Sequence, residues 1–196
     1  MIISTMAKVK LFVEGIADVK FLQDYISHIF SKQIKKHEDI VDFTGKDKLI
    51  PQQFQINTDA GGVNLLVFDA NGNFEKRKKE LLAKAKELNI QFELFLFPNN
   101  QDKGELENLL EKIINPSNKK IFDCFNEYEK CLSIDKSRFK TPALKTKIFA
   151  YVDTLDLKDE GFAKEEKRNY LNKEHWDLEH ASLIPLKIFL NRYFPR

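Results

Sequence analysis

Three short stretches of the sequence place carboxylate or amide side chains after apolar runs. Glu14 follows KVKLFV, and Asp69 with Asn71 follows VNLLVF. Glu105 and Glu107 follow FELFLF after an intervening loop. If these runs are neighbouring parallel strands, their carboxyl ends meet at one edge of a sheet. Oxygen ligands from separate strands suit a hard divalent cation, which one or two carboxylates hold together with a substrate phosphate.

A cation at this edge would polarise a phosphoryl oxygen and activate a water or hydroxyl for in-line attack. The segment Thr44-Gly45-Lys46 also falls at a strand end, and Lys46 is the predicted phosphate contact with a catalytic role. Four basic residues, 76–79, follow Asp69 and could contact flanking phosphates. For most of these four, a solvated face balanced by nearby glutamates is the preferred interpretation.

The elements that must position these residues alternate between strand-like and helical patterns through the first hundred residues. The predicted strands cover 8–13, 39–45, 63–69 and 91–98, and the predicted helices cover 18–31, 46–54, 74–88 and 105–114. Strands alternating with helices predict an α/β fold with right-handed crossovers and a parallel sheet.

The pattern becomes helical after Asn115-Pro116. Helices are predicted over 119–134, 142–155 and 180–193, and 157–169 is predicted to be a mobile surface loop. The last helix carries an apolar stripe and should pack on the sheet. We therefore expect a core over 8–115 and a helical extension over 116–196 packed on it.

Composition limits the partners. A chain of 196 residues with 42% hydrophobic content can bury one sizeable core. Its formal net charge of +2 excludes a globally basic surface for nucleic acid, so any attraction to phosphate must be local. The chain shows neither a signal peptide nor the ~20 apolar residues of a membrane span, which predicts a cytoplasmic protein with no membrane partner.

The cysteines and histidines carry no predicted chemistry. Cys124 and Cys131 lie in a predicted helix, about 10 Å apart along its axis, and are interpreted as reduced packing residues. His28 is interpreted as a surface or packing residue, and 175–177 as an aromatic anchor with a cap for the last helix.

The motifs VEGIAD, VFDAN and GELENLL, in this order, resemble those of the TOPRIM superfamily. This superfamily supplies the metal-binding module of topoisomerases, bacterial primases, recombination proteins and OLD-type nucleases. The resemblance covers about residues 8–115 and is to small stand-alone bacterial members of unknown function and to OLD-type nucleases. The stretch HWDLEHASLIPLKIFL is similar to the end of those stand-alone proteins. The resemblance implies a Rossmann-like three-layer core around the parallel sheet.

The resemblance also implies roles for individual residues, with Mg2+ or Mn2+ as the cofactor. The implied metal ligands are Glu14, Asp18, Asp69, Asn71 and Glu107. The predicted catalytic residues are Glu14, Asp69 and Lys46. Two positions depart from the superfamily pattern, because Asn71 and Asn108 stand where aspartates are expected. An amide oxygen can still bind a hard cation, but each change removes one negative charge.

Structural roles compete with metal binding at several positions. Asp18 opens a predicted helix and could cap it, with capping and metal binding given equal weight. Asp69 could belong to a turn that ends a strand, although a site is preferred. Glu105 and Glu107 suit the first turn of a helix, and for Glu105 this structural role is preferred. Glu14 has no comparable role in packing.

These observations lead to a preferred function and two alternatives. The first is metal-dependent phosphodiester hydrolysis on nucleic acid, with DNA favoured over RNA as partner. The second is a degenerate, non-catalytic module that binds nucleic acid or a partner protein, and a third, weaker one is phosphotransfer on a small nucleotide. The chain lacks the GxxxxGK[ST] motif, so an ATPase or other protein partner would act in trans.

Overall fold

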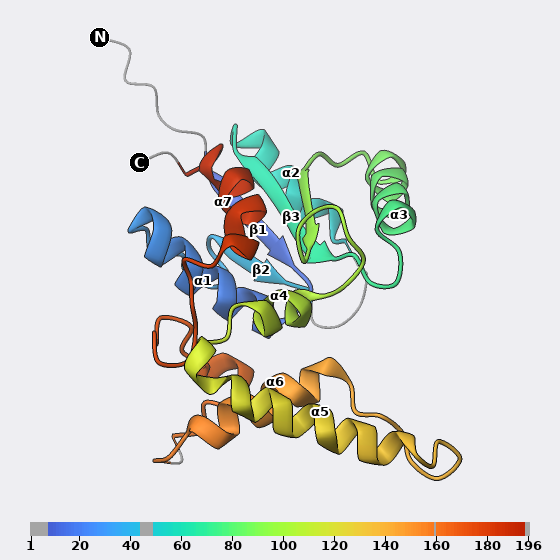
Figure 1. Ribbon diagram of the computed structural model, residues 1–196. Coiled ribbons are helices and arrows are strands. Elements are labelled where there is room, and N and C mark those ends of the chain that lie inside the picture. Colours follow the sequence, from blue (N-terminus) through green and yellow to red (C-terminus); the bar gives the residue numbers. More distant parts are fainter. Residues whose placement is uncertain (1–7, 44–48, 159, 195–196) are drawn as a thin grey trace.

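A parallel sheet forms the centre of the molecule in this computed structural model, which describes residues 8–43, 49–158 and 160–194 (Figure 1). Its four strands in the described chain lie in the order β2-β1-β3-β4. They are β1 (Val9–Val13), β2 (Ile40–Asp42), β3 (Val63–Asp69) and β4 (Glu93–Phe97). In register, Val13 pairs with Asp42 on one side and with Val67 on the other. The predicted α/β class and parallel sheet are confirmed.

Helices cover both faces of this sheet. On one face lie α1 (Ile16–Phe30), α4 (Leu106–Lys112) and α7 (Ile184–Asn191), and on the other lie α2 (Pro51–Asp59) and α3 (Phe74–Glu87). Alternate strand residues serve the two layers, since Leu11 and Val13 pack with α1 whereas Phe12 packs with Phe54 of α2. The predicted three-layer arrangement is therefore present, and apolar strands buried on both faces explain it.

Two helices depart most from their predicted bounds, whereas the others begin and end within about three residues of them. The helix predicted over 46–54 is α2, which begins at Pro51 and continues to Asp59, because proline favours the first helical turn; residues 46–48 lie outside the described ranges. The helix predicted over 180–193 is a 3-10 turn, η3 (Ala181–Leu183), followed by α7. His180 rather than Asp177 supplies the cap, accepting a hydrogen bond from the Ser182 N–H.

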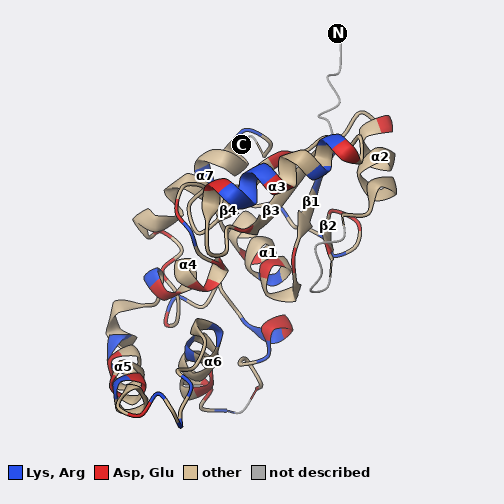
Figure 2. Ribbon diagram, turned by 90° about the vertical axis from the view of Figure 1, so that its right-hand side faces the viewer, with Lys and Arg blue, Asp and Glu red and all other residues tan. Residues whose placement is uncertain are grey.

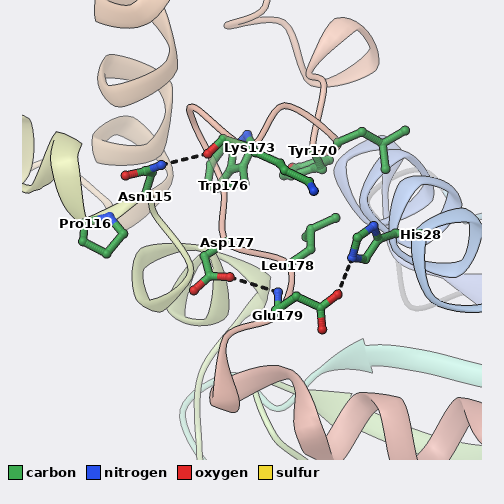
Figure 3. Close-up of a pocket in the computed structure, with 10 residues that line it drawn as sticks. His28, Asn115, Pro116, Tyr170, Lys173, Trp176, Asp177, Leu178 and Glu179 are labelled. Atoms are coloured by element: carbon green, nitrogen blue, oxygen red, sulfur yellow. Dashed lines mark hydrogen bonds and ion pairs between the residues drawn. The ribbon is translucent and has the colours of Figure 1, made fainter.

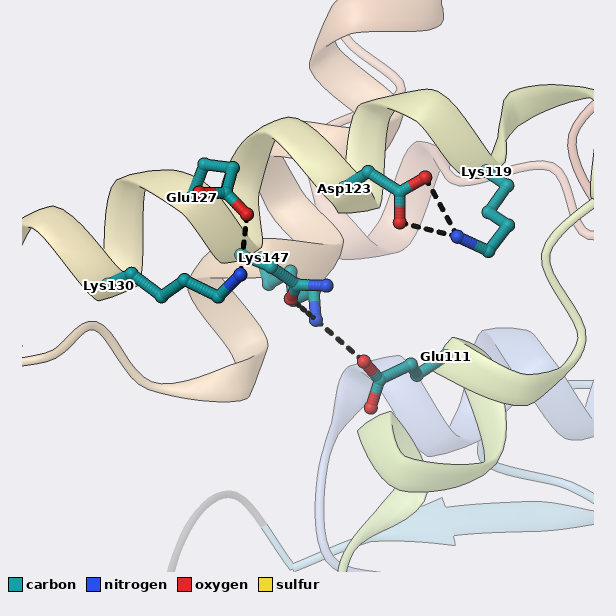
Figure 4. Close-up of polar contacts among 7 residues, drawn as sticks. Glu111, Lys119, Asp123, Glu127, Lys130 and Lys147 are labelled. Carbon is teal, nitrogen blue, oxygen red and sulfur yellow. Dashed lines mark hydrogen bonds and ion pairs between the residues drawn. The ribbon is translucent and has the colours of Figure 1, made fainter.

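The extension places α5 (Lys119–Ser133) and α6 (Leu144–Leu155) side by side below the sheet (Figure 1). The buried Lys147 of α6 donates hydrogen bonds to Glu111 Oε1 at 2.6 Å and to Asn126 Oδ1 at 2.7 Å, and so ties α6 to the α4 segment and to α5 (Figure 4). The extension also contains the short turns η1 (Pro116–Asn118) and η2 (Glu165–Lys167).

Two features bear on the sequence-based expectations for the surface. Cys124 and Cys131 are free thiols on exposed positions of α5, so their interpretation as packing residues is wrong. Among the helices of the described residues, none combines the length and the hydrophobicity needed to cross a bilayer.

Candidate functional site

The predicted acidic residues lie where the order of the strands reverses. The chain passes from β1 to β2 on one side and then returns to β3 on the other side of β1. Ligands of open α/β sheets bind in the crevice outside the carboxyl ends of the strands at such a point. Glu14 directly follows β1, and Asp69 is the last residue of β3. The topology therefore brings these two residues together.

Glu14 is held by a basic residue of α3. Its Oε1 atom accepts a hydrogen bond from Arg77 Nη2 at 2.8 Å and lies 3.4 Å from the Asp69 backbone nitrogen. The Glu14 side chain is 29% exposed and that of Arg77 is 12% exposed. Glu14 thus remains accessible while Arg77 fixes its orientation.

Asp18 both caps α1 and joins the acidic cluster. Its Oδ2 atom accepts a hydrogen bond from the Gly15 N–H at 2.8 Å, so the predicted capping role is confirmed. The side chain is nonetheless buried. Burial, together with the charges of Glu14 and Glu107, raises the pKa of Asp18 to about 8. Asp18 therefore lies within electrostatic reach of both glutamates.

Asp69 connects β3 to the start of α4. Its Oδ1 atom accepts a hydrogen bond from the Leu106 N–H at 2.9 Å. Burial raises the pKa of Asp69 to about 9, and the charges of Asp18, Glu14 and Glu107 act in the same direction. Asp69 thus stands within the field of three other carboxylates.

Glu107 and Glu105 have different positions at the beginning of α4. Glu107 is buried, and burial followed by the charge of Glu105 raises its pKa, whereas Lys145 lowers it. Glu105 is the exposed N-cap residue, and its N–H donates to Asn108 Oδ1 at 2.8 Å. Asn108 therefore closes a capping box, which is a structural function that an amide performs as well as a carboxylate.

Asn71 follows Asp69 by two residues, in the loop after β3. It adopts φ 53°, and its N–H and carbonyl each pair with the backbone of Gly104 at 2.8 Å. Its exposed side chain lines a hollow of about 350 Å³ together with Asn73, Lys76 and Arg77. Lys46, the predicted catalytic lysine, lies outside the described residues, as do Thr44 and Gly45.

Sequence reasoning missed Arg77, which it grouped with the solvated charges of α3. Figure 2 shows basic residues spread along this helix, but Arg77 is the one that reaches Glu14. Helical spacing could have identified it. Arg77 stands three residues after Phe74 and four before the buried Leu81, on the side of α3 that faces the sheet.

The extension also approaches the acidic cluster. Glu165 of η2 pairs with Lys145 of α6 at 2.5 Å, and η2 packs against α1. The charge of Glu165 contributes to the raised pKa values of Asp18 and Glu107. The segment predicted to be a mobile surface loop over 157–169 is thus packed in part, with Arg168 buried. Glu165 had no motif that could identify it, since only tertiary packing brings it near α1.

The residues fit a hard divalent cation by the chemistry of their donors. The charges of Glu14, Asp18 and Glu107 all raise the pKa of Asp69, and Asp18 and Glu107 are buried. Within the described ranges, no three histidine, cysteine, aspartate or glutamate side chains already form a metal-binding group. The donor types therefore suit Mg2+ or Mn2+, while a ligand shell would require the carboxylates to turn toward one another.

A pocket of about 230 Å³ lies away from these carboxylates, between α1 and the segment before η3 (Figure 3). His28 Nε2 pairs with Glu179 Oε1 at 2.6 Å at its rim, and the buried Trp176 lines it. The pair fastens the end of α1 to the C-terminal segment. The expectation that His28 is a surface or packing residue agrees with this contact.

Comparison with known proteins identifies the family. No curated protein and no solved structure matches the chain. A family model described as "Protein of unknown function (DUF3226)" matches residues 8–195, which include both the sheet with its acidic edge and the helical extension. Because the match extends over nearly the whole length, this chain belongs to the DUF3226 family.

Proposed function

We propose that this protein is a divalent-metal-dependent phosphodiesterase that acts on nucleic acid. The observation that carries the proposal is the convergence of Glu14, Asp18 and Glu107 on Asp69, whose pKa their charges raise, at the reversal point of a parallel sheet. Several carboxylates are costly to collect in a partly buried place, and perturbed pKa values of this kind are typical of functional sites. The TOPRIM-like order of the motifs points to the same chemistry.

The four carboxylates would hold the cation, with the amide oxygen of Asn71 as a further ligand. Bound there, Mg2+ or Mn2+ would polarise a phosphoryl oxygen and lower the pKa of a water molecule. Glu14 would accept a proton from the attacking water, because it is the accessible member of the cluster and its orientation is fixed. Asp69 ties this edge to α4 through Leu106 and keeps the carboxylates in place.

Arg77 would balance the charge of the site. Its guanidinium group touches Glu14 and lies 5.7 Å from the Phe68 ring, which restricts where it can move. A guanidinium beside a carboxylate favours the ionised form, which a proton acceptor needs. The same group can also offer a bidentate contact to a phosphate.

The nucleic-acid backbone would run along the hollow beside Arg77. Lys76 and the first turn of α3, capped by Asn73, line this hollow and offer donors to phosphate. Such contacts position a strand without reading its sequence. DNA is favoured over RNA as the substrate. Lys46 remains a proposed catalytic residue that contacts phosphate. An ATPase or another protein partner would act in trans.

The alternative is a module that binds nucleic acid or a partner protein without catalysis. Asn71 and Asn108 favour it, because each stands where the superfamily pattern has an aspartate and so removes one negative charge. In this alternative, the carboxylates would be a remnant of a catalytic site.

Plasmid cleavage separates the two functions. Purified protein is incubated with supercoiled plasmid and with single-stranded DNA and RNA in Mn2+, beside the variants Glu14→Gln and Asp69→Asn. We expect the parent to cleave and both variants to lose activity. The exposed Glu105→Gln serves as the matched control and should retain it. Equal cleavage by the parent and the site variants, or none by any of them, would contradict the proposed hydrolysis.

Calorimetric titration with Mn2+ gives a second readout. We expect heat of binding from the parent and a weaker or absent signal from Asp69→Asn. Binding without cleavage would favour the non-catalytic module, whereas no binding at millimolar Mn2+ would remove the metal site altogether.

A further inference from the structure

The extension leaves one side of α5 uncovered. This helix has 15 residues, of which only Phe122 is among the buried ones, although apolar side chains recur along it at helical spacing. Tyr128 is 50% exposed, and Phe149 on the neighbouring α6 is 48% exposed. No labelled element lies beneath the α5–α6 pair (Figure 1).

The uncovered side forms a groove of about 440 Å³ between the two helices. Its apolar lining comes from Ile121, Cys124, Phe125 and Tyr128 of α5 and Ala150 of α6. An exposed apolar groove with polar residues at its rim is typical of a protein-binding surface.

A lysine that lines the groove and a glutamate on the same side of α5 form a pair that could complement a second copy of itself. Lys120 lines the groove, and Glu127 stands seven residues later on α5, so the two lie on the same side of the helix about 10 Å apart along its axis. Both residues are exposed, and Glu127 also pairs with Lys130 of the same helix at 2.5 Å (Figure 4). Midway between them stands Cys124. A twofold axis near Cys124 would therefore place Lys120 of each chain beside Glu127 of the other chain, which gives two symmetric ion pairs.

We propose that this groove binds a second copy of the chain, with the two α5 helices antiparallel across a twofold axis near Cys124. An isologous interface requires one surface that complements itself, and a lysine and a glutamate placed symmetrically about an apolar centre meet that requirement. A partner with a uniformly basic or acidic surface would face like charge at one end of the groove. The pairing is independent of the metal site at the sheet edge.

Charge exchange tests the pairing. The mass of the parent, measured by light scattering or sedimentation, should rise with concentration from 23.0 kDa toward twice that value. Lys120→Glu and Glu127→Lys should each weaken dimerisation on the order of tenfold, because each creates two like-charge contacts. The double variant Lys120→Glu/Glu127→Lys restores opposite charges and should dimerise like the parent.

Oxidative cross-linking tests the position of the axis. In a Cys131→Ser background, Cys124 lies close to its symmetry mate and should form a covalent dimer. In the matched Cys124→Ser background, the Cys131 residues would stand about 20 Å apart along the axis, beyond the reach of a disulfide. Three results would overturn the proposal: equal cross-linking through either cysteine, failure of the double variant to regain dimerisation, and a monomeric protein even near millimolar concentration. The same results would be expected if the groove bound an unrelated protein instead.

Discussion

At the scale of single residues, the state of Glu14 depends on Arg77. A glutamate at the end of a strand suggests a functional site in any sequence, but whether its carboxyl group is ionised depends on the neighbouring charges. Here its charge acts on two other carboxyl groups, Asp18 and Asp69, and one guanidinium at 2.8 Å balances it. Glu14 and Arg77 are 63 positions apart in the sequence.

Arg77→Ala is expected to lower DNA cleavage about 10- to 100-fold, the usual effect of losing a partner that orients a functional carboxylate. Arg77→Lys should recover part of the activity, since it restores charge without the fixed geometry of the guanidinium. Steady-state cleavage assays measure both variants. Lys79→Ala on the exposed side of α3 is the control, and an equal loss in that variant would show that general basicity matters instead.

The raised pKa values predict how stability changes with pH. Asp18 and Asp69 have pKa values of about 8 and about 9 in the folded state, against 3.8 ordinarily. The stabilisation from their bound protons is fully present below pH 3.8 and is lost as pH rises through the folded values. Asp69→Asn cannot ionise, so its melting temperature should exceed that of the parent by a margin that widens toward pH 9.

Scanning calorimetry without divalent cations, from pH 4 upward, measures that margin. The variant Asp153→Asn, at an exposed position, is the control, and its melting temperature should differ from that of the parent by an amount that does not change with pH. Added Mn2+ should stabilise the parent most at high pH, because a cation competes with the bound protons. A margin independent of pH would contradict the assignment of a partly buried, protonated carboxyl to Asp69.

At the scale of elements, the loop after β4 brings α4 to the acidic edge. The backbones of Gly104 and Asn71 pair with each other, which joins the end of the β3 segment to the start of α4. Gly104 adopts φ +140°, a conformation that side chains rarely permit. The strand patterns predicted which elements exist, whereas this pairing between two loops has no periodic signal.

Gly104→Ala is expected to destabilise the protein by about 1–3 kcal/mol, the typical cost of a strained backbone position. An added Cβ would lie 2.5 Å from Asn108 Oδ1, so the capping box of α4 would also have to shift. Urea unfolding gives the free energy. Gly72→Ala in the neighbouring loop is the matched control, since nothing lies within 4 Å of its Cβ and it should change stability little.

At the scale of the whole molecule, one hydrophobic cluster runs through both the sheet and the extension. It includes Leu65 of β3, Ile148 of α6 and Leu186 of α7. Lys147 adds a polar connection, since its buried ammonium group holds Glu111 and Asn126 and lies 4.7 Å from the Phe122 ring. The position of the extension relative to the acidic edge therefore depends on a few buried contacts.

Lys147→Ala should lower the free energy of unfolding by about 2–3 kcal/mol, because it removes a charged hydrogen-bond donor from two partners. Lys147→Met keeps the packing of the stem and should cost less. Lys119→Ala removes the exposed pair with Asp123 on α5 (Figure 4) and should stay within about 0.5 kcal/mol in the same urea experiment. Equal effects of Lys119→Ala and Lys147→Ala would contradict the role of Lys147 as a connection between helices.

The sequence by itself determined the order of strands and helices and the edge at which Glu14, Asp69 and Glu107 gather. Apolar runs and helical spacing are local signals, and parallel strands must align their carboxyl ends. Only the tertiary structure decided that Arg77 supports Glu14 and that Glu165 approaches Asp18, since 147 positions separate the latter pair. Contacts at such separations depend on how whole helices pack, and packing depends on side chains throughout the core rather than on any one motif.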